Sequence, residues 1–562
     1  MHRRSFLSIG AAAAARPGWA QARDYPLRWV YVSRSLAKDS DVQDIRKIAL
    51  TASQHGLNGI LLAAGLDNAR RKNLDYEARL VQVKKICQDH NLEIIPLIFS
   101  IGYGSAILSY DRNLAEGLPV RDALFVARNG VAQFQPDPAV AIVNGGFEEA
   151  GSEYKGHKLK GFDLQDQPGE VSFIDREVRR EGGASLRLEN FRPPHGHGRV
   201  MQEVAIRPNR CYRVTCWVKT EGLEPKGAFR IMALTRTGRE IAPFEPDVPA
   251  TADWRKVVLG FNSMNFDKVR LYAGVWGGRG GKCWLDELGI EEVGLANVLR
   301  RPGTPLRVRS EAKDMVYEEG RDYAPVADPR LSFEFDHDGP PIRLAFNTRI
   351  AEGERLLVDY YHGMSVHHGQ VTACMSEPKV YEVMEEQAQR VQELLQPAKF
   401  MFSMDEIRAG GSCEACRKRG LSMAQILGDC ITRQTGIVRK LNPKAEVSIW
   451  SDMLDPNHNA HGNYYLVDGD FTGSWNYIPK DLRIVCWYYE KRRESLQFFS
   501  KLGYKTVAGA YYDGDTLDNP KGWLEELDAT PGASGIMYTT WRNKYELLGP
   551  FGDLVSRGAG HP

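Results

Sequence analysis

The sequence of 562 residues predicts an α/β fold, a (β/α)₈ TIM barrel that is interrupted after its third strand by a β-sandwich insertion. Strand-like and helix-like segments alternate over residues 27–108 and again from 376 onward, which is typical of a parallel sheet covered by helices. Between them, residues 141–293 carry short strand-like runs and Gly/Pro turns with hardly any helical period, which is typical of a β-sandwich. Three strands before the insertion and five after it make the eight of a barrel.

The first part of the barrel is predicted from five segments in order. "LRWVYVS", "NGILLAA" and "LEIIPLIFS" are apolar runs of strand length, and "SDVQDIRKIALTASQHG" and "DYEARLVQVKKICQDHN" have the helical period. After the insertion the same alternation predicts helices at 376–396, 421–441, 491–502 and 519–528, and strands at 399–405, 445–451, 482–488, 505–511 and 535–541.

The predicted domain boundaries follow from these strand and helix patterns. We expect an export signal at 1–22, the first part of the barrel at 23–140, the sandwich at 141–293, a β-rich linking subdomain at 294–361 and the remainder of the barrel at 362–562.

The N-terminus predicts export. Arg3 and Arg4 precede a weakly hydrophobic run that closes on the small-residue cleavage pattern Ala20-Gln21-Ala22. "RRSFL" resembles a twin-arginine signal, and an ordinary Sec signal is the alternative; either predicts a periplasmic or secreted protein. No other apolar run approaches the ~20 residues of a membrane span.

The charge pattern and the aromatic content bear on partners. Lys plus Arg number 73 and Asp plus Glu 72, a balance that gives no indication of a nucleic-acid partner. The 11 Trp and 23 Tyr fit a glycan partner, because proteins grip sugars with flat aromatic faces. The oligomeric state is left open.

Two adjacent carboxylates, Asp405 and Glu406, stand where the fourth predicted barrel strand ends. Neighbouring side chains in a strand point to opposite faces, so both can reach one site only if the strand ends there. In barrel enzymes the active site lies at this carboxyl-terminal rim. The alternative is an acid pair that accepts hydrogen bonds from loop amides.

Other predicted strands carry residues suited to sugar binding. Trp450, Trp487 and Trp541 stand at the ends of three different strands, where they would form an apolar cup beside the acids. The candidate polar groups are Arg28 on the first strand, Tyr511 and Asp513 on the seventh, and Asn543 after the eighth.

These segments resemble the family 20 glycoside hydrolases, the β-N-acetylhexosaminidases. The resemblance runs through "YPLRWVYVSRSL", "NLEIIPLIFSIGYGSAIL", "CMSEPKVYEVMEEQAQRVQELLQPAKFMFSMDE" and the "YYD" of the seventh strand. It departs from the family's pattern before the acid pair, where Phe402-Ser403-Met404 replaces a His-x-Gly-Gly, and at Tyr103, which replaces a turn histidine.

The resemblance implies an exo-acting, retaining, substrate-assisted hydrolase that needs no cofactor. Glu406 would be the general acid and base, Asp405 would orient the 2-acetamido group, and Tyr511 would hydrogen-bond its oxygen. Arg28, Asp513 and Asn543 would contact sugar hydroxyls, and Trp450, Trp487 and Trp541 would line the ring and acetamido pockets. The alternatives are a hydrolase for a sugar without the 2-acetamido group and a non-catalytic glycan-binding protein.

The insertion also resembles a known class. "VNGGFEEAG" at its start and "CWLDELGIEEV" at its end are similar to the first and last strands of jelly-roll carbohydrate-binding modules. That resemblance implies a structural calcium held by Glu148 and Asp286. A purely structural insert that walls one side of the pocket is the alternative.

The spacing of the nine cysteines does not indicate a disulfide-rich fold. Cys413-x-x-Cys416 follows the acid pair and supplies half of a zinc site. Cys374 and Cys430 would complete it only if the fold brought them close, and a disulfide or free thiols are the other possibilities.

Overall fold

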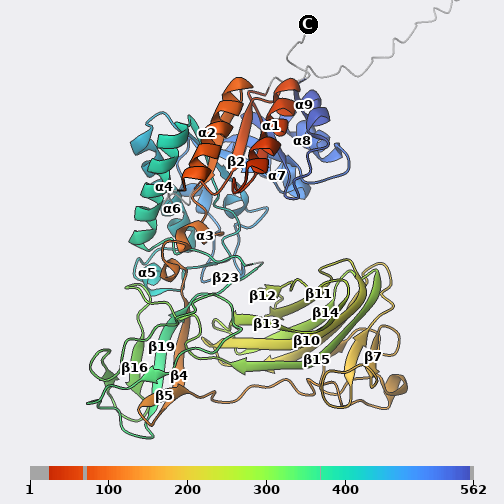
Figure 1. Ribbon diagram of the computed structural model, residues 1–562, viewed down its shortest axis with the longest axis vertical. Coiled ribbons are helices and arrows are strands. Elements are labelled where there is room, and N and C mark those ends of the chain that lie inside the picture. The colour runs from red at the N-terminus through yellow and green to blue at the C-terminus, as the bar shows by residue number, and fades with distance from the viewer. Residues whose placement is uncertain (1–24, 67–72, 368, 557–562) are drawn as a thin grey trace, which may run out of the picture.

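A computed structural model describes residues 25–66, 73–367 and 369–556. The predicted export signal at 1–22 lies outside these residues. Figure 1 shows a barrel with its helices at one end of the molecule, and further sheets side by side at the other end.

The barrel is confirmed, with eight parallel strands that close on themselves. Their order around the barrel is β1 (Leu27–Ser33), β2 (Gly59–Ala63), β3 (Glu93–Ile98), β20 (Lys399–Phe402), β22 (Glu446–Trp450), β24 (Arg483–Cys486), β25 (Lys505–Tyr511) and β26 (Ala533–Thr539). The helices that cover this end are α1 (Asp39–Gln54), α2 (Leu74–Asp89), α4 (Pro378–Leu395), α6 (Met423–Leu441), α7 (Arg492–Lys501), α8 (Asp518–Asp528) and α9 (Leu548–Ser556).

Strand alternation divides the barrel side chains between two cores. Leu27, Trp29 and Tyr31 of β1 point inward and pack with Met401 and Val507 in a cluster that fills the barrel. The residues between them, such as Val30 and Val32, pack outward against the helices. The inward cluster is a closed floor, so a ligand can only sit above it, at the carboxyl ends of the strands.

The chain between β3 and β20 builds three further sheets. Two are five-stranded, in the orders β13-β10-β15-β8-β7 and β12-β11-β14-β9-β6. Their strands are β6 (Leu164–Gln165), β7 (Ser172–Asp175), β8 (Ser185–Leu188), β9 (Gly198–Ala205), β10 (Cys211–Glu224), β11 (Phe229–Leu234), β12 (Glu240–Phe244), β13 (Ala252–Asn262), β14 (Lys268–Val275) and β15 (Gly280–Glu292). Side chains from both sheets share one hydrophobic core, as in a β-sandwich.

The third sheet corrects one predicted assignment. It has the order β17-β16-β19-β4-β5-β18, from β4 (Leu118–Arg128), β5 (Val131–Phe134), β16 (Arg307–Ser310), β17 (Val316–Tyr317), β18 (Ile342–Arg343) and β19 (Arg355–His362). β4 and β5 fall within 23–140, which we assigned to the barrel, and they pair instead with the linking region. Asn129 and Gly130 join them with positive φ, the backbone of a tight hairpin turn.

The ends of this inserted region lie side by side in a neck. Ala115 and Ala373 form an antiparallel bridge, the Glu116 N–H donates to the Thr372 oxygen at 2.8 Å, and the Cys374 N–H donates to the Leu114 oxygen at 2.9 Å. The chain therefore leaves the barrel and returns to it at one place.

The sandwich also contacts the barrel near its carboxyl rim. β21 (Ala409–Gly410) and β23 (Leu466–Val467) are a short parallel pair on that rim. Arg239 of the sandwich donates to the backbone oxygens of Tyr465 at 2.6 Å and Val467 at 2.8 Å. Among the described residues, every helix is too short or too polar to cross a bilayer.

Candidate active site

A cavity of about 460 Å³ opens above the barrel floor. Its lining brings together two carboxylates and a wall of aromatic rings, and it comes from seven of the eight strands or the loops that follow them. The lining residues are Tyr31, Leu97, Tyr103, Ser403, Asp405, Glu406, Trp450, Trp487, Tyr512 and Trp541. Both predicted acids and all three predicted tryptophans are thus in one cavity, and none of these lining residues comes from the sandwich.

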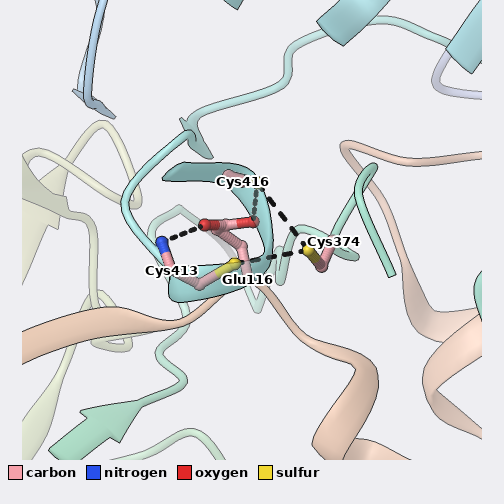
Figure 2. Close-up of side chains that lie close together, drawn as sticks. All are labelled: Glu116, Cys374, Cys413 and Cys416. Atoms are coloured by element: carbon pink, nitrogen blue, oxygen red, sulfur yellow. Dashed lines mark hydrogen bonds between the residues drawn. The ribbon is translucent and has the colours of Figure 1, made fainter. Parts of the chain in front are cut away.

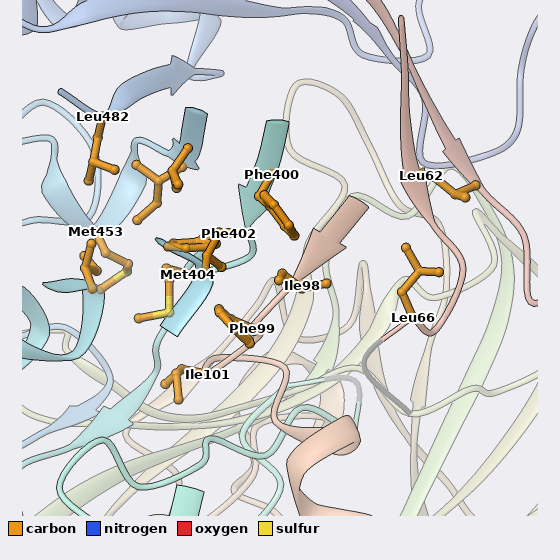
Figure 3. Packing of buried hydrophobic residues seen from close by; sticks show 14 of the residues in the cluster. Leu62, Leu66, Ile98, Phe99, Ile101, Phe400, Phe402, Met404, Met453 and Leu482 are labelled. Carbon is orange, nitrogen blue, oxygen red and sulfur yellow. The ribbon is translucent and has the colours of Figure 1, made fainter. Parts of the chain in front are cut away.

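The end of β20 explains how two adjacent acids share this cavity. Phe402 and Met404 point outward into the core between the barrel and the helices (Figure 3), and alternation therefore turns Ser403 and Asp405 inward. Glu406 would face outward in a regular strand, but its φ of 49° places it in the left-handed region. This reversal brings its side chain into the cavity beside Asp405.

Glu406 has partners at both its carboxylate and its backbone. Its carboxylate forms an ion pair with Arg408 at 3.0 Å and accepts a hydrogen bond from the Tyr103 hydroxyl. Its backbone oxygen accepts from Gln370 Nε2 at 2.6 Å, and Gln370 also accepts from Arg408. Arg408 lies over the ring of Tyr465, on the loop that the sandwich contacts. The Tyr103 hydroxyl thus contacts the Glu406 carboxylate directly.

Asp405 has a different environment. Its Oδ1 accepts a hydrogen bond from Ser403 Oγ at 2.8 Å. Burial raises the pKa of Asp405 to about 6, the negative charge of Glu406 adds to the rise, and the Ser403 hydrogen bond opposes it. Asp405 therefore titrates near neutral pH inside the cavity.

A third carboxyl lies beneath the pair. Asp452 is fully buried after β22, and its Oδ2 accepts from the Glu406 N–H at 2.8 Å and from Asn459 Nδ2 at 3.0 Å. Burial, followed by the charge of Asp405, raises the pKa of Asp452 to about 8. The side chain is therefore neutral at pH 7 and supports the Glu406 backbone without adding a charge.

We expect the stability of the Asp452→Asn variant to rise relative to that of the wild type as pH increases from about 4 to about 8, with a slope of about 1.4 kcal/mol per pH unit. Asparagine keeps an oxygen for the Glu406 and Asn459 donors but cannot ionise. In this window the folded wild type holds a proton that the unfolded chain has released, so its stability falls with pH. Urea unfolding of both proteins across the window measures the difference, and parallel curves would contradict the assignment.

The aromatic wall is built from contacts between neighbouring rings. Trp450 is buried at the base of the cavity, and its ring centroid lies 6.3 Å from that of the half-exposed Trp541. The ring centroids of Trp541 and Tyr31 are 5.0 Å apart. Trp487 and Tyr512 stack with an interplanar angle of 5°. Flat faces at several angles suit a sugar ring, whose C–H groups pack against aromatics.

Tyr511 is corrected by the structure, which puts Tyr512 in the cavity instead. Tyr511, Tyr512 and Asp513 all have positive φ, so the strand alternation breaks at the end of β25. The Tyr511 ring stacks on Tyr538 in the core behind the barrel, with 4.1 Å between the ring centroids, whereas Tyr512 is half-exposed and lines the cavity.

Arg28 is also corrected. It points outward because Trp29 points inward, and it lies at the opposite end of the barrel from the cavity. Its guanidinium donates to the backbone oxygens of Gly56 at 2.8 Å and Tyr25 at 2.5 Å. The arginine at the carboxyl end of β1 is Arg34, which donates to Asn543.

Asp513 and Asn543 lie at the rim without lining the cavity. Asp513 accepts hydrogen bonds from the Trp541 N–H at 2.9 Å, from the Arg542 N–H at 3.3 Å and from the Thr540 hydroxyl. Its carboxylate therefore positions the loop that carries Trp541 and has little capacity left for a sugar hydroxyl. Asn543 accepts from Arg34 and is exposed.

The predicted calcium ligands both contact one loop of the sandwich. Asp286 accepts backbone N–H groups of Arg180 at 2.8 Å and Glu181 at 3.2 Å, and Glu148 accepts that of Gly183 at 2.7 Å. Burial and the charge of Glu148 raise the pKa of Asp286. The loop amides already engage most of the carboxylate oxygens, and the calcium site stays a prediction.

Five residues of the cavity were not among the predicted site residues: Tyr31, Leu97, Tyr103, Ser403 and Tyr512. Strand alternation could have predicted Tyr31, Leu97 and Ser403, since each lies on the same strand face as an inward-pointing residue. Tyr103 and Tyr512 lie on irregular backbone, for which a periodic pattern gives no signal.

Comparison with known proteins gives only distant likenesses. No family model and no curated protein matches the sequence. Among solved structures, a Flavobacterium johnsoniae chitobiase is similar over 95% of this chain and 48% of its own, with 9% identity and a TM-score of 0.35. A β-N-acetylhexosaminidase is similar over 35% of this chain and 46% of its own, with 12% identity and a TM-score of 0.26.

A "Family 16 Carbohydrate Binding Module-2" is similar over 26% of this chain and 97% of its own, with 17% identity and a TM-score of 0.20. The chain spans about half the length of the two enzymes. Similarity at this level says nothing of activity, so the function has to be inferred from the cavity itself.

Proposed function

We propose that the protein is a glycoside hydrolase that cleaves a β-linked glycan in the cavity above the barrel. The observation that carries the proposal is the acid pair: Asp405 and Glu406 face one aromatic-walled cavity, although neighbouring strand residues ordinarily face apart. Two carboxyl groups at one site, with different surroundings, are what glycosidic bond cleavage requires.

The two acids have distinct proposed roles. Glu406, which the Tyr103 hydroxyl contacts, is the proposed acid for the glycosidic oxygen and later the base for water. Asp405 is the proposed partner of a 2-acetamido group, which attacks the anomeric carbon and gives a retained configuration. For this role Asp405 must be ionised while Glu406 still carries the proton that it donates, so kcat/KM should rise as pH increases toward the Asp405 pKa of about 6 and fall once Glu406 is ionised. Tyr512 takes the place we gave to Tyr511 in contacting the substrate.

The surroundings of the cavity suggest a substrate longer than one sugar. A second hollow of about 650 Å³ adjoins it and shares Tyr103. This hollow carries polar groups, among them Asp111, Asn113 and Gln370. We propose that one sugar fills the aromatic cavity and that the rest of the glycan lies beyond Tyr103.

From the N-terminal pattern we also propose that the enzyme is exported by the twin-arginine route.

One observation favours a second candidate, a non-catalytic glycan-binding protein. Glu406 is engaged by both Arg408 and Tyr103. These contacts stabilise a charged carboxylate, and a charged carboxylate cannot donate a proton to a leaving group. In the hydrolase a bound sugar would have to displace one of them.

The test is hydrolysis of a panel of nitrophenyl β-glycosides with and without a 2-acetamido group. The anomer released is followed by NMR, and the wild type is compared with Asp405→Asn. Substrate-assisted hydrolysis predicts activity on the N-acetylhexosaminides, a retained anomer and a rate that rises toward about pH 6 before it falls at higher pH. Activity only on sugars without the acetamido group would remove the role of Asp405. Glycan binding without turnover of any oligosaccharide would favour the second candidate.

A further inference from the structure

Four buried side chains from three distant segments meet at the neck (Figure 2). Cys374 Sγ lies 3.5 Å from Cys413 Sγ and 3.9 Å from Cys416 Sγ, and Cys416 Sγ lies 3.6 Å from Glu116 Oε2. All four are at most 4% exposed, and their ligand atoms lie within 4.8 Å of one another. The sequence supplied the Cys413-x-x-Cys416 half of this cluster. The fold adds Cys374 and Glu116, whereas Cys430 is not part of it.

We propose that these side chains bind a structural zinc ion through three sulfurs and one carboxylate oxygen. Zinc sites of this kind are tetrahedral, with Zn–S near 2.3 Å and Zn–O near 2.0 Å, so the S–S edges are about 3.8 Å and the S–O edges about 3.5 Å. The S–S separations of 3.5 and 3.9 Å and the S–O separation of 3.6 Å match these edges. With four protein ligands the site is closed, as structural zinc sites are.

The charges and hydrogen bonds around the cluster suit a metal. A buried carboxylate against thiols is costly unless a cation compensates it. The Cys413 N–H donates to Glu116 Oε1 at 3.0 Å, which leaves Oε2 directed at the sulfurs. The buried guanidinium of Arg301 acts electrostatically on Cys374, Cys413 and Glu116. It also pairs with Glu377 at 2.8 Å, so it offsets part of the negative charge of three thiolates and a carboxylate around one Zn²⁺.

The position of the cluster indicates what the ion does. Glu116 stands where the chain leaves the barrel and Cys374 where it returns. The other two cysteines follow the acid pair, Cys413 directly before the short helix α5 (Glu414–Arg417) and Cys416 within it. Zinc would fasten the neck to the loop that runs from Glu406, and so hold the inserted sheets and the cavity rim in one arrangement. A single disulfide could join only two of these three segments.

Metal analysis of the full-length mature protein, purified without a metal-affinity tag, is the direct test. We expect about one zinc per chain and nine titratable thiols after denaturation with a chelator. Removing the zinc from the native protein should lower the Tm by at least about 5 °C, and adding zinc back should restore it. Metal-free protein with nine thiols, or with seven because a disulfide has formed, would overturn the proposal.

Variants locate the site independently of activity. Cys413→Ser should lose the zinc, and Glu116→Gln should release it to a chelator faster than the wild type does. Cys430→Ser, a buried cysteine outside the cluster, is the matched control and should keep the zinc. If Cys413→Ser does not fold, the zinc content of the wild type and the rate of zinc release from Glu116→Gln still show whether the cluster binds zinc. Zinc retained at full stoichiometry and at the wild-type release rate by both cluster variants would overturn this placement.

Discussion

Replacing Glu406 with glutamine is expected to lower kcat for glycoside hydrolysis about 1,000-fold while glycan binding stays within a few-fold of the wild type. Glutamine is nearly isosteric and can still accept from Tyr103, but it cannot transfer a proton. In the proposed function the rings of Trp487, Tyr512 and Trp541 supply most of the binding surface, and the substitution leaves them in place. Single-turnover rates and tryptophan fluorescence on glycan binding measure the two effects separately.

The matched control is Glu446→Gln. Glu446 is also paired with an arginine, Arg483, but it begins β22 at the far end of the same barrel. It should keep wild-type kcat, which would show that loss of a charged pair alone does not abolish activity. If Glu406→Gln kept more than about a tenth of wild-type kcat, Glu406 would not be the acid and the hydrolase mechanism would have to be abandoned.

The barrel was predictable because its strands are buried on both faces. Such strands appear as short apolar runs, and helices with a clear period separate them, so all eight could be placed to within a few residues. The hairpin of β4 and β5 could also have been predicted from the sequence, since "NG" between two apolar runs is a strong hairpin signal. We assigned it to the barrel by its position in the chain alone.

The candidate site was predictable only as far as strand alternation holds. Asp405 follows the alternation of β20, and Arg28 could have been excluded by the alternation of β1. Glu406 and Tyr511 depend on left-handed backbone at residues other than glycine, which nothing in the local sequence specifies. One such residue brought the second acid into the cavity, and another took the predicted tyrosine out of it.

The cysteine cluster was unpredictable for a different reason. Its members belong to segments far apart in the chain, and the barrel and the inserted sheets must both form before Glu116 and Cys374 become neighbours. A sequence motif reports ligands that are close in the chain, so it identified Cys413 and Cys416, whereas Cys374 was only one of two candidates beside Cys430. The fourth ligand, a lone glutamate, has no signature at all.

The backbone that carries the acid pair gives the last prediction, for Gly102→Ala. Gly102 is buried after β3, and a Cβ there would overlap the Asp405 carbonyl oxygen and lie 2.9 Å from that of Glu406. We expect kcat to fall about 100-fold, because an acid displaced by about 1 Å is out of reach of its proton acceptor, and stability to fall by about 1–3 kcal/mol from overpacking. Gly436→Ala is the matched control: it lies exposed in α6 with open space around its Cβ position, and should gain about 0.5–1 kcal/mol at unchanged kcat. Wild-type kcat in Gly102→Ala would mean that the acids can shift without consequence, which is incompatible with general acid catalysis at this rim.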